Sequence, residues 1–187
     1  MKGYVFEDLL SKKVLIEGDV GSGKTHLTRI LLIQATELLP SGSITVIDMA
    51  PHRRRLDRDY AGGALRKGKW ITHVRYLRSA FIKPPRLDGR TKEEVLDLAK
   101  SNAAELRKLL QAFLNKPSDT LFINDLTLYL HSGDAEFLFF VLAKASTFIA
   151  NAYEGSRLLD DRDSGISSRE RHLVSELEKR MDLTIRL

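Results

Sequence analysis

The stretch Gly18-Asp19-Val20-Gly21-Ser22-Gly23-Lys24-Thr25 decides the fold of this chain. It matches the pattern G-x-x-x-x-G-K-[ST] without a gap, and it joins an apolar strand, Lys13 to Glu17, to a helix predicted over about Lys24 to Leu39. Glycines let the backbone wrap closely around an anion and adopt positive φ angles. Successive N–H groups and the N-terminus of the helix then face phosphate oxygens. The stretch therefore predicts a phosphate-binding loop between a strand and a helix.

This pattern is the P-loop, or Walker A motif, and all eight of its residues are predicted to border a bound nucleotide. Lys24 is expected to reach the β- and γ-phosphates, and the Thr25 hydroxyl is expected to ligate Mg²⁺. His26 follows on the first helical turn, where it borders the predicted site and is expected to pack or to cap the helix. The expected cofactors are ATP and Mg²⁺.

A P-loop needs an acidic residue at the end of an apolar strand to hold Mg²⁺, usually through water. Asp125 follows Thr120-Leu121-Phe122-Ile123-Asn124 and is the predicted Walker B residue, because this acid usually lies one or more strands beyond the first crossover. Asp48, which ends Ile44-Thr45-Val46-Ile47, is the competing candidate. It is expected near the phosphates in either case, since the carboxyl ends of parallel strands converge on the site.

The length of 187 residues predicts a single domain over residues 1–187. Short apolar runs alternate with helical periods along the chain, which predicts a parallel sheet covered by helices. The expected architecture is α/β, with a mostly parallel sheet in a three-layer α/β/α arrangement. Thr91-Lys92-Glu93-Glu94 is typical of a capping box and opens a helix predicted to about Asn115. Pro84-Pro85 predicts an extended linker. The remaining expected strands lie in Trp70 to Leu77, Ser146 to Asn151 and Leu183 to Leu187, and the remaining helices in about Gly133 to Lys144 and Ser167 to Met181. Ser167-Ser168-Arg169-Glu170 is predicted to cap the last of these helices.

Three segments together resemble the ASCE branch of P-loop NTPases, most of all the RecA- and KaiC-like ATPases and their small archaeal members: Gly18 to Thr25, Phe122 to Asp125, and Met181 to Leu187. The resemblance covers most of the chain, but only the P-loop is specific. It implies a RecA-like fold, Mg²⁺-dependent ATP hydrolysis, and assembly into rings or filaments with the nucleotide near a subunit interface. It also implies a polar sensor of the γ-phosphate at a strand tip, which is the place of Asn151.

The chain departs from these families because it lacks their catalytic glutamate, which orients the attacking water. Leu126 follows Asp125 directly, and Met49 and Ala50 stand just beyond the second strand. Either Asp48 or Asn124 is expected to replace the glutamate; otherwise hydrolysis is slow or depends on a partner. The predicted catalytic set is Lys24, Asp48, Asp125 and Asn151.

Positive charge gathers in one segment of about residues 50–90, interpreted as a basic insertion. Between Ala50 and Arg86, eleven Lys and Arg residues stand against two Asp residues, so this part carries about +9 and the remainder about −4. The segment predicts contact with DNA, RNA or phosphates bound by a neighbouring subunit; alternatively, it is a solvated face that offsets acidic helices. The nucleic-acid contacts are assigned to Arg53, Arg54, Arg55 and Arg58, and candidates for an arginine acting on the transferred phosphate are Arg53, Arg54, Arg55, Arg157, Arg162 and Arg169.

Composition narrows the functional classes. The 187 residues are 43% hydrophobic and 29% charged, as in globular domains, and the absence of cysteine excludes disulfides, thiolate metal sites and cysteine nucleophiles. No apolar run is long enough to span a bilayer, and no secretory signal is present, so a cytoplasmic protein is expected. Besides an ATPase that acts on a partner or assembles as a homo-oligomer, two alternatives stay open. One is an ATP-sensing module with little turnover, and the other is a small-molecule or nucleotide kinase with Arg53 to Lys69 as its lid.

Overall fold

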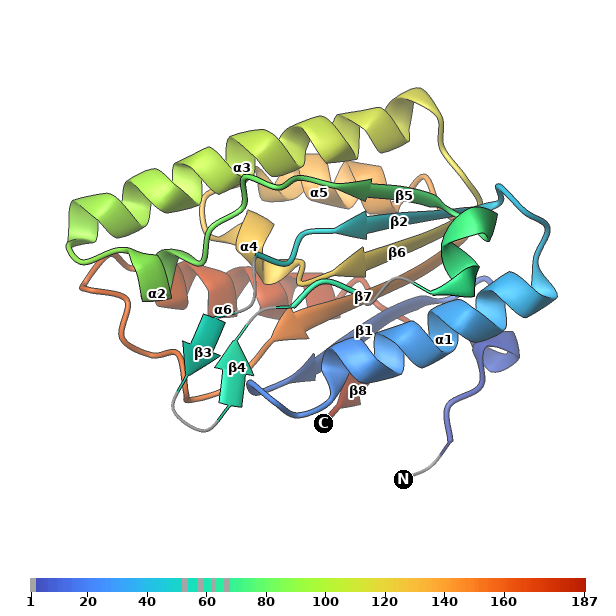
Figure 1. Cartoon of the computed structure of the whole chain (residues 1–187), viewed down its shortest axis with the longest axis horizontal. Helices are drawn as coiled ribbons and strands as arrows, with labels where there is room; N and C mark the ends of the chain where they lie inside the picture. The colour runs from blue at the N-terminus through green and yellow to red at the C-terminus, as the bar shows by residue number, and fades with distance from the viewer. Residues whose placement is uncertain (1–2, 52–53, 57–58, 62, 66–67) are drawn as a thin grey trace.

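Six parallel strands form the central sheet of this computed structural model, which describes residues 3–51, 54–56, 59–61, 63–65 and 68–187. The strands stand in the order β5-β2-β6-β7-β1-β8, and every neighbouring pair is parallel (Figure 1). Parallel neighbours need a crossover connection, and helices supply it. The strand ranges are β1 Lys13–Gly18, β2 Ile44–Asp48, β5 Arg75–Arg78, β6 Thr120–Asn124, β7 Thr147–Tyr153 and β8 Leu183–Arg186.

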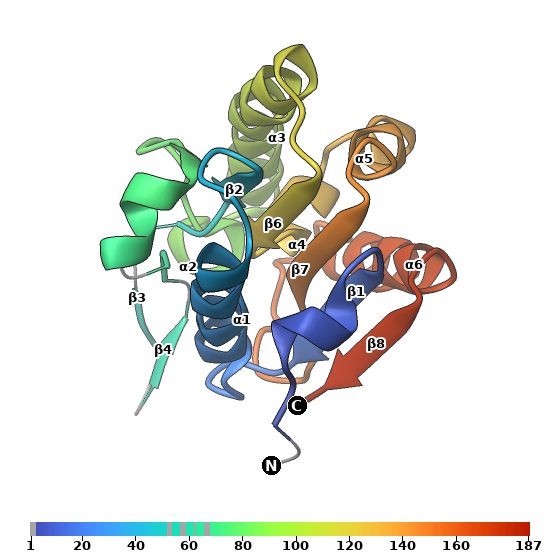
Figure 2. The same ribbon diagram turned by 90° about the vertical axis from the view of Figure 1, so that its right-hand side faces the viewer.

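Helices cover both faces of this sheet, which confirms the predicted three-layer α/β/α arrangement (Figure 2). One face carries α1 (Lys24–Leu38) together with the short 3-10 helices η1 (Phe6–Leu9) and η2 (Lys69–His73). The one-turn helix α2 (Pro85–Asp88) contacts α3. The opposite face carries α3 (Lys92–Asn115), α4 (Thr127–Leu130), α5 (Ala135–Leu142) and α6 (Ile166–Glu178).

The central strands are buried on both faces, as expected for a parallel sheet covered by helices. On β1, Val14 and Ile16 belong to the same apolar cluster as Leu31 of α1. Leu15 points to the other side and belongs to the cluster that contains Leu110 of α3. The alternation of side chains along one strand thus links both helical layers to the segment that leads into the P-loop.

The carboxyl ends of β2, β6, β7 and β1 bring polar residues to one edge of the sheet. Asp48 at the end of β2 pairs in register with Asn124 at the end of β6. On β7, Asn151 pairs with Ile16, two residues before the loop begins at Gly18. Because β7 separates β6 from β1, Asn151 lies between the Asp125 strand and the P-loop strand.

Local structure differs from the prediction in four places. The strand expected in Trp70 to Leu77 begins only at Arg75, because the preceding residues form η2, which buries Trp70 in the α1-side cluster. Pro84-Pro85 does not begin an extended linker, because Pro85 opens α2, where the first turn requires no N–H from it. The strand expected to end at Asn151 continues to Tyr153. The last helix begins at Ile166, one residue before its expected start at Ser167.

The cap at the start of α3 is confirmed at Thr91, whose Oγ1 accepts from Glu94 N at 3.3 Å. The Glu94 carboxylate accepts in turn from Arg90 N at 2.7 Å, one residue before the cap. The basic segment contributes β3 (Arg54–Leu56) and β4 (Asp59–Ala61), which pair as an antiparallel hairpin, and also η2, the edge strand β5 and α2. Part of this segment is therefore built into the domain. No described helix combines the length and the apolar character needed to cross a bilayer.

Candidate functional site

The P-loop connects β1 to α1 with the conformation that its glycines allow. Gly23, directly before α1, has φ +101°, a left-handed conformation that a side chain would strain. The Asp19 carboxylate accepts hydrogen bonds from Val20 N at 2.6 Å and from Ser156 N at 2.9 Å. A Cβ on Gly155 would lie 2.2 Å from Asp19 Cγ, so the glycine permits this contact. Asp19 therefore fixes the loop to the segment that follows β7.

The Lys24 side chain lies over the loop. Its Nζ donates to the carbonyl oxygens of Gly18 and Asp19, both at 2.7 Å. Burial lowers the pKa of Lys24, and the carboxylates of Asp125, Asp19 and Glu170 partly counteract this shift. The ammonium group is thus held by neutral carbonyls, which a phosphate can replace with stronger charge-assisted bonds.

Lys24 and Thr25 line a cavity of about 130 Å³ together with Asp125 and Asn151. Burial raises the pKa of Asp125, whereas Lys24 and His131 act in the opposite direction. Mg²⁺ is commonly held by a few protein oxygens plus substrate phosphates, and the hydroxyl and carboxylate here are ligands of that type. Among the described residues, no group of three or more His, Asp or Glu side chains is arranged to hold a metal ion by itself. The residues present therefore fit a cation that arrives with a triphosphate.

Three of the predicted residues join one buried network at the strand ends. Asn151 Nδ2 donates to Thr28 Oγ1 at 2.9 Å and to Asn124 Oδ1 at 2.8 Å, while its Oδ1 accepts from Asp125 N at 2.9 Å. Asn124 Nδ2 donates in turn to Asp48 Oδ1 at 2.7 Å. The structure thus links Asp48 and Asn151 through Asn124.

The Asp48 carboxylate is fully engaged in this network. Besides Asn124, it accepts hydrogen bonds from Tyr76 OH at 2.5 Å, Leu65 N at 2.8 Å and Ala50 N at 3.2 Å. Its side chain is completely buried, and the cavity beside Lys24 is lined by other residues. These four bonds fill the acceptor positions of a carboxylate.

The remaining predicted residues lie in different surroundings. Val20 and Gly21 line the cavity, whereas Gly18 is buried at the end of β1. His26 is exposed on α1, with its Nδ1 3.5 Å from Arg29 Nη2. Arg53 and Arg58 lie outside the described residues, and for Arg54 and Arg55 the structure describes the backbone of β3 alone.

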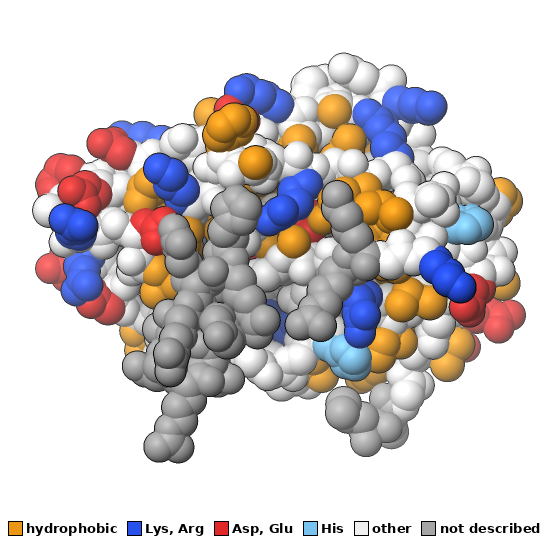
Figure 3. Space-filling view, in the orientation of Figure 1, with side chains coloured by type: hydrophobic (Ala, Val, Ile, Leu, Met, Phe, Trp, Pro, Cys, Tyr) orange, Lys and Arg blue, Asp and Glu red, His pale blue; other side chains and the backbone are white. Residues whose placement is uncertain are grey.

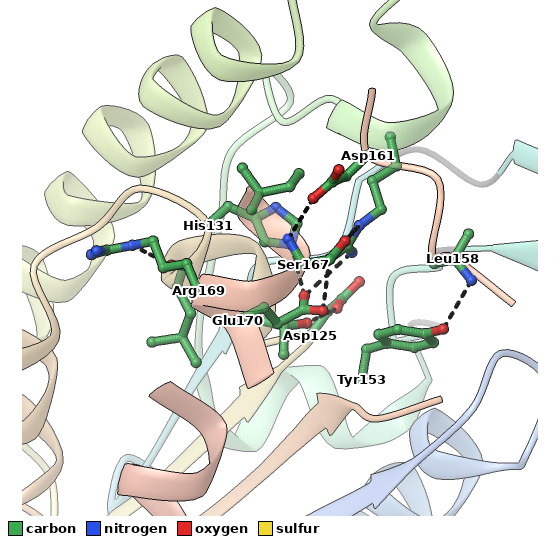
Figure 4. Close-up of polar contacts among 12 residues, drawn as sticks. Asp125, His131, Tyr153, Leu158, Asp161, Ser167, Arg169 and Glu170 are labelled. Atoms are coloured by element: carbon green, nitrogen blue, oxygen red, sulfur yellow. Dashed lines mark hydrogen bonds and ion pairs between the residues drawn. The ribbon is translucent and has the colours of Figure 1, made fainter. Parts of the chain in front are cut away.

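The wall of the cavity opposite the P-loop contains charged residues that sequence reasoning did not place there. Glu170 of α6 accepts from Arg86 Nη2 at 2.8 Å, and its other oxygen lies 2.7 Å from His131 Nε2 (Figure 4). Burial alone would raise the pKa of Glu170, but His131 and Arg86 hold it below its usual value. Arg86 and His131 line the cavity, and Glu170 holds both in place.

One signal in the sequence points to Glu170. The buried positions of α6 are Ile166, Glu170, Val174 and Leu177, so a glutamate occupies the apolar stripe of an amphipathic helix. The pattern Ser167 to Glu170 also fits a helix cap, and a glutamate is common in the first turn of a helix, so its position in the apolar stripe does not stand out. A charged residue on the buried face of a helix instead indicates a buried partner.

No protein-family model and no curated protein matches this chain. Among solved structures, the chain is similar to the flagellar accessory protein FlaH from Methanocaldococcus jannaschii, with 12% sequence identity and a TM-score of 0.52 over 95% of this chain and 71% of that chain. It also matches the Pif1 helicase from Candida albicans, with 13% identity and a TM-score of 0.37 over 95% of this chain and 36% of that chain. The likeness to FlaH confirms the RecA-like P-loop NTPase fold expected from the sequence.

Proposed function

We propose that this chain binds ATP with Mg²⁺ at the P-loop and hydrolyses it slowly or in response to a partner. The observation that carries this proposal is the placement of Lys24 and Thr25 with Asp125 around one cavity, at the carboxyl edge of a parallel sheet. Ligands of open α/β folds bind outside the carboxyl ends of the strands. A site with a lysine, a hydroxyl and a carboxylate at this edge suits a triphosphate and its cation.

Each residue has a proposed role in this site. The loop N–H groups and Lys24 hold the β- and γ-phosphates, while Thr25 and Asp125 hold Mg²⁺, with Asp125 acting through water. When bound, Mg²⁺ neutralises phosphate charge and orients the terminal group. Asn151 borders the same cavity and is the proposed sensor of that group, but both hydrogens of its amide already donate to protein atoms, so sensing requires a change of partners.

The second candidate is an ATP-sensing module with little turnover. The residues found where a catalytic glutamate is expected favour it. Leu126 and Met49 are completely buried, and Ala50 is 1% exposed. Apolar side chains at these positions cannot orient a water molecule. A kinase is the third candidate, and transfer of phosphate to an added acceptor distinguishes it from the other two.

Calorimetry with ATP and Mg²⁺ tests the proposed function, with phosphate release measured in parallel. Lys24→Ala is expected to lower ATP affinity about 10- to 100-fold, because a charge-assisted contact is lost. Lys12→Ala is a matched control, since Lys12 is exposed and donates to the Asp8 carbonyl. Unchanged affinity in Lys24→Ala would refute the assignment of the site. Release of phosphate without an acceptor favours the ATPase, and binding without turnover under all conditions favours the sensing module.

Contact with nucleic acid is proposed for the basic segment. On the face drawn in Figure 3, the described Lys and Arg side chains are scattered among acidic and apolar ones and form no continuous basic patch. The proposal therefore depends on the excess of Lys and Arg in the sequence of the basic segment. Replacing Arg53, Arg54 and Arg55 by Glu is expected to abolish salt-sensitive DNA binding and to leave ATP binding intact. Mass measurements with and without nucleotide test the proposed homo-oligomer.

A further inference from the structure

Three of the six arginines named from the sequence as candidates to contact the transferred phosphate have other partners in the structure. Arg169 donates to the carbonyl oxygens of Leu130 at 3.1 Å and Gly133 at 2.8 Å, so it joins α6 to the end of α4. Arg162 forms an exposed ion pair with Asp160. Arg157 is exposed, and its Nη1 lies 3.5 Å from the Val20 carbonyl. None of these three lines the cavity beside Lys24.

Arg86 does line that cavity, as the only arginine among the described residues of its wall. It belongs to α2, whose start is fixed by Pro84 and Pro85, and only 8% of its surface is exposed. The ring of Tyr153 connects it to the P-loop side: Lys24 Nζ lies 5.9 Å from the ring centroid, and Arg86 Cζ lies 5.8 Å from it. Both cations thus contact one aromatic side chain in the wall of one cavity.

The contacts that hold Arg86 leave part of its guanidinium group available. Nη2 and Nη1 donate to the two oxygens of Glu170, at 2.8 and 3.4 Å, and Nε donates to Ser167 Oγ at 3.2 Å. A guanidinium group has five N–H bonds, so these contacts occupy three of them. Two can therefore donate to a ligand in the cavity without loss of the ion pair.

His131 supplies an independent sign that this wall is built for more than packing. Its Nε2 is held by Glu170, yet Nδ1 is buried without a hydrogen-bond partner among the described residues. Buried polar atoms are normally satisfied, so an unpaired one beside a cavity points to a missing partner there. The Arg86–Glu170 ion pair also contributes little net stability, because removing both charged groups from water costs about as much free energy as their attraction provides.

We propose that Arg86 contacts the terminal phosphate of the bound nucleotide, so that this chain supplies its own arginine instead of receiving one from a neighbouring subunit. Glu170 is the positioning residue that fixes the orientation of Arg86. This inference rests on the proposed function, since it requires a nucleoside triphosphate in the P-loop. The contact stabilises the charge on the phosphoryl group as water bonds to the γ-phosphorus, the bond to the β–γ bridging oxygen breaks, and ADP leaves with that oxygen, while the hydrogens of the water remain on the released phosphate.

A contact to the terminal phosphate separates triphosphates from diphosphates. The test is therefore calorimetry of ADP and of a non-hydrolysable ATP analogue, both with Mg²⁺, which gives the two affinities to compare. The double variant Arg86→Gln/Glu170→Gln keeps a neutral hydrogen-bonded pair and leaves no uncompensated buried charge. It is expected to bind the analogue about 10-fold more weakly, with ADP affinity within about 2-fold of wild type. Any phosphate release should fall by about 100-fold or more.

Two further variants keep the test decisive. Arg86→Lys retains the positive charge beside Glu170 but loses the planar fork, so it is expected to fold and to lose part of the preference for the triphosphate. Arg107→Gln is the matched control, because Arg107 is half-exposed on α3, where its Nη1 lies 3.9 Å from Asp134 Oδ2. This variant should leave both affinities unchanged. Equal weakening of both ligands, or no weakening of either, in the folded variants would overturn the inference. Wild-type protein that binds neither ligand would instead overturn the proposed function on which the inference rests.

Discussion

Two buried polar networks border the cavity, and they differ in how the chain brings their members together. The strand-end network consists of Thr28, Asn151, Asn124 and Asp48, which lie on α1 and on three neighbouring strands. The helix network consists of Arg86, His131 and Glu170, which come from α2, from the residue after α4, and from α6. Adjacent strands assemble the first network, whereas the packing of three helical segments assembles the second.

The two networks also differ in charge, which suggests different roles. In the strand-end network, amides and hydroxyls surround a single carboxylate, and the Asp48 carboxylate has four hydrogen bonds. The helix network pairs a buried guanidinium group with a buried carboxylate and leaves His131 Nδ1 unpaired. Fully satisfied buried hydrogen bonds rigidify a structure, whereas a buried ion pair adds little net stability. We therefore propose that the first network mainly supports the site, apart from the sensing role proposed for Asn151, and that the second contributes to its chemistry.

The largest expected effect is on stability when the helix network loses its carboxylate. Glu170→Ala leaves the Arg86 charge buried without a partner, so the free energy of unfolding should fall by about 3–5 kcal/mol. Urea denaturation measures this change. Arg86→Met/Glu170→Met removes both charges, but buried His131 Nε2 still loses its partner, so the double variant should recover part of the loss. If the double variant is as unstable as the single one, the ion pair itself is a major source of stability, and the contrast between the two networks fails.

The sequence predicts that the strand ends of the strand-end network converge, because that information is local. The hydrogen bonds among these side chains, and the part that Thr28 takes in them, come from the structure. Asp48, Asn124 and Asn151 each stand at or near the end of an apolar run, and parallel strands bring their carboxyl ends to one edge. The P-loop is predicted for the same reason, since its glycines, lysine and threonine are consecutive. Capping at Thr91 is equally local, and the structure confirms it.

The helix network escapes prediction because it depends on which helix faces meet. Arg86 lies within the segment interpreted as a basic insertion, directly after the two prolines that predict an extended linker. It belongs to α2, and a one-turn helix is too short to show a helical periodicity in the sequence. The sequence pattern Ser167 to Glu170 predicts a capping role for Glu170, whereas α6 already begins at Ile166 and Glu170 lies on its buried face. Sequence spacing carries no information on the contact of residues 86, 131 and 170, which tertiary packing alone creates.

A smaller effect is expected from the strand-end network. Asn124→Ala removes the donor to Asp48 and the acceptor for Asn151, so buried polar groups lose partners and the free energy of unfolding should fall by about 1–3 kcal/mol. Asn115→Ala is the matched control, since Asn115 is exposed at the end of α3 and accepts from Gln111 at 3.2 Å. A loss in Asn124→Ala no larger than in the control would contradict a supporting role for this network.

The smallest expected effect concerns Glu17, a buried carboxylate of β1 that belongs to neither network. Among the described residues neither of its oxygens has a hydrogen bond, and Arg186 Nε lies 3.6 Å from one of them. Burial, together with the nearby Glu154 and Glu178, raises the pKa of Glu17 from 4.5 to about 8. Glu170 shows the opposite shift, because His131 and Arg86 stabilise its charged form.

The sign of the pH dependence follows from this raised pKa. Between pH 4.5 and about 8, folded Glu17 holds a proton that the unfolded chain has released, so its contribution to stability falls as pH rises and levels off above that range. The loss between pH 7 and pH 8 should be about 1 kcal/mol. Urea denaturation of Glu17→Gln should lack this slope, whereas Glu93→Gln, exposed on α3, should retain it. An unchanged slope in Glu17→Gln would mean that another group titrates, and that a buried carboxylate without hydrogen bonds is tolerated here as an ion.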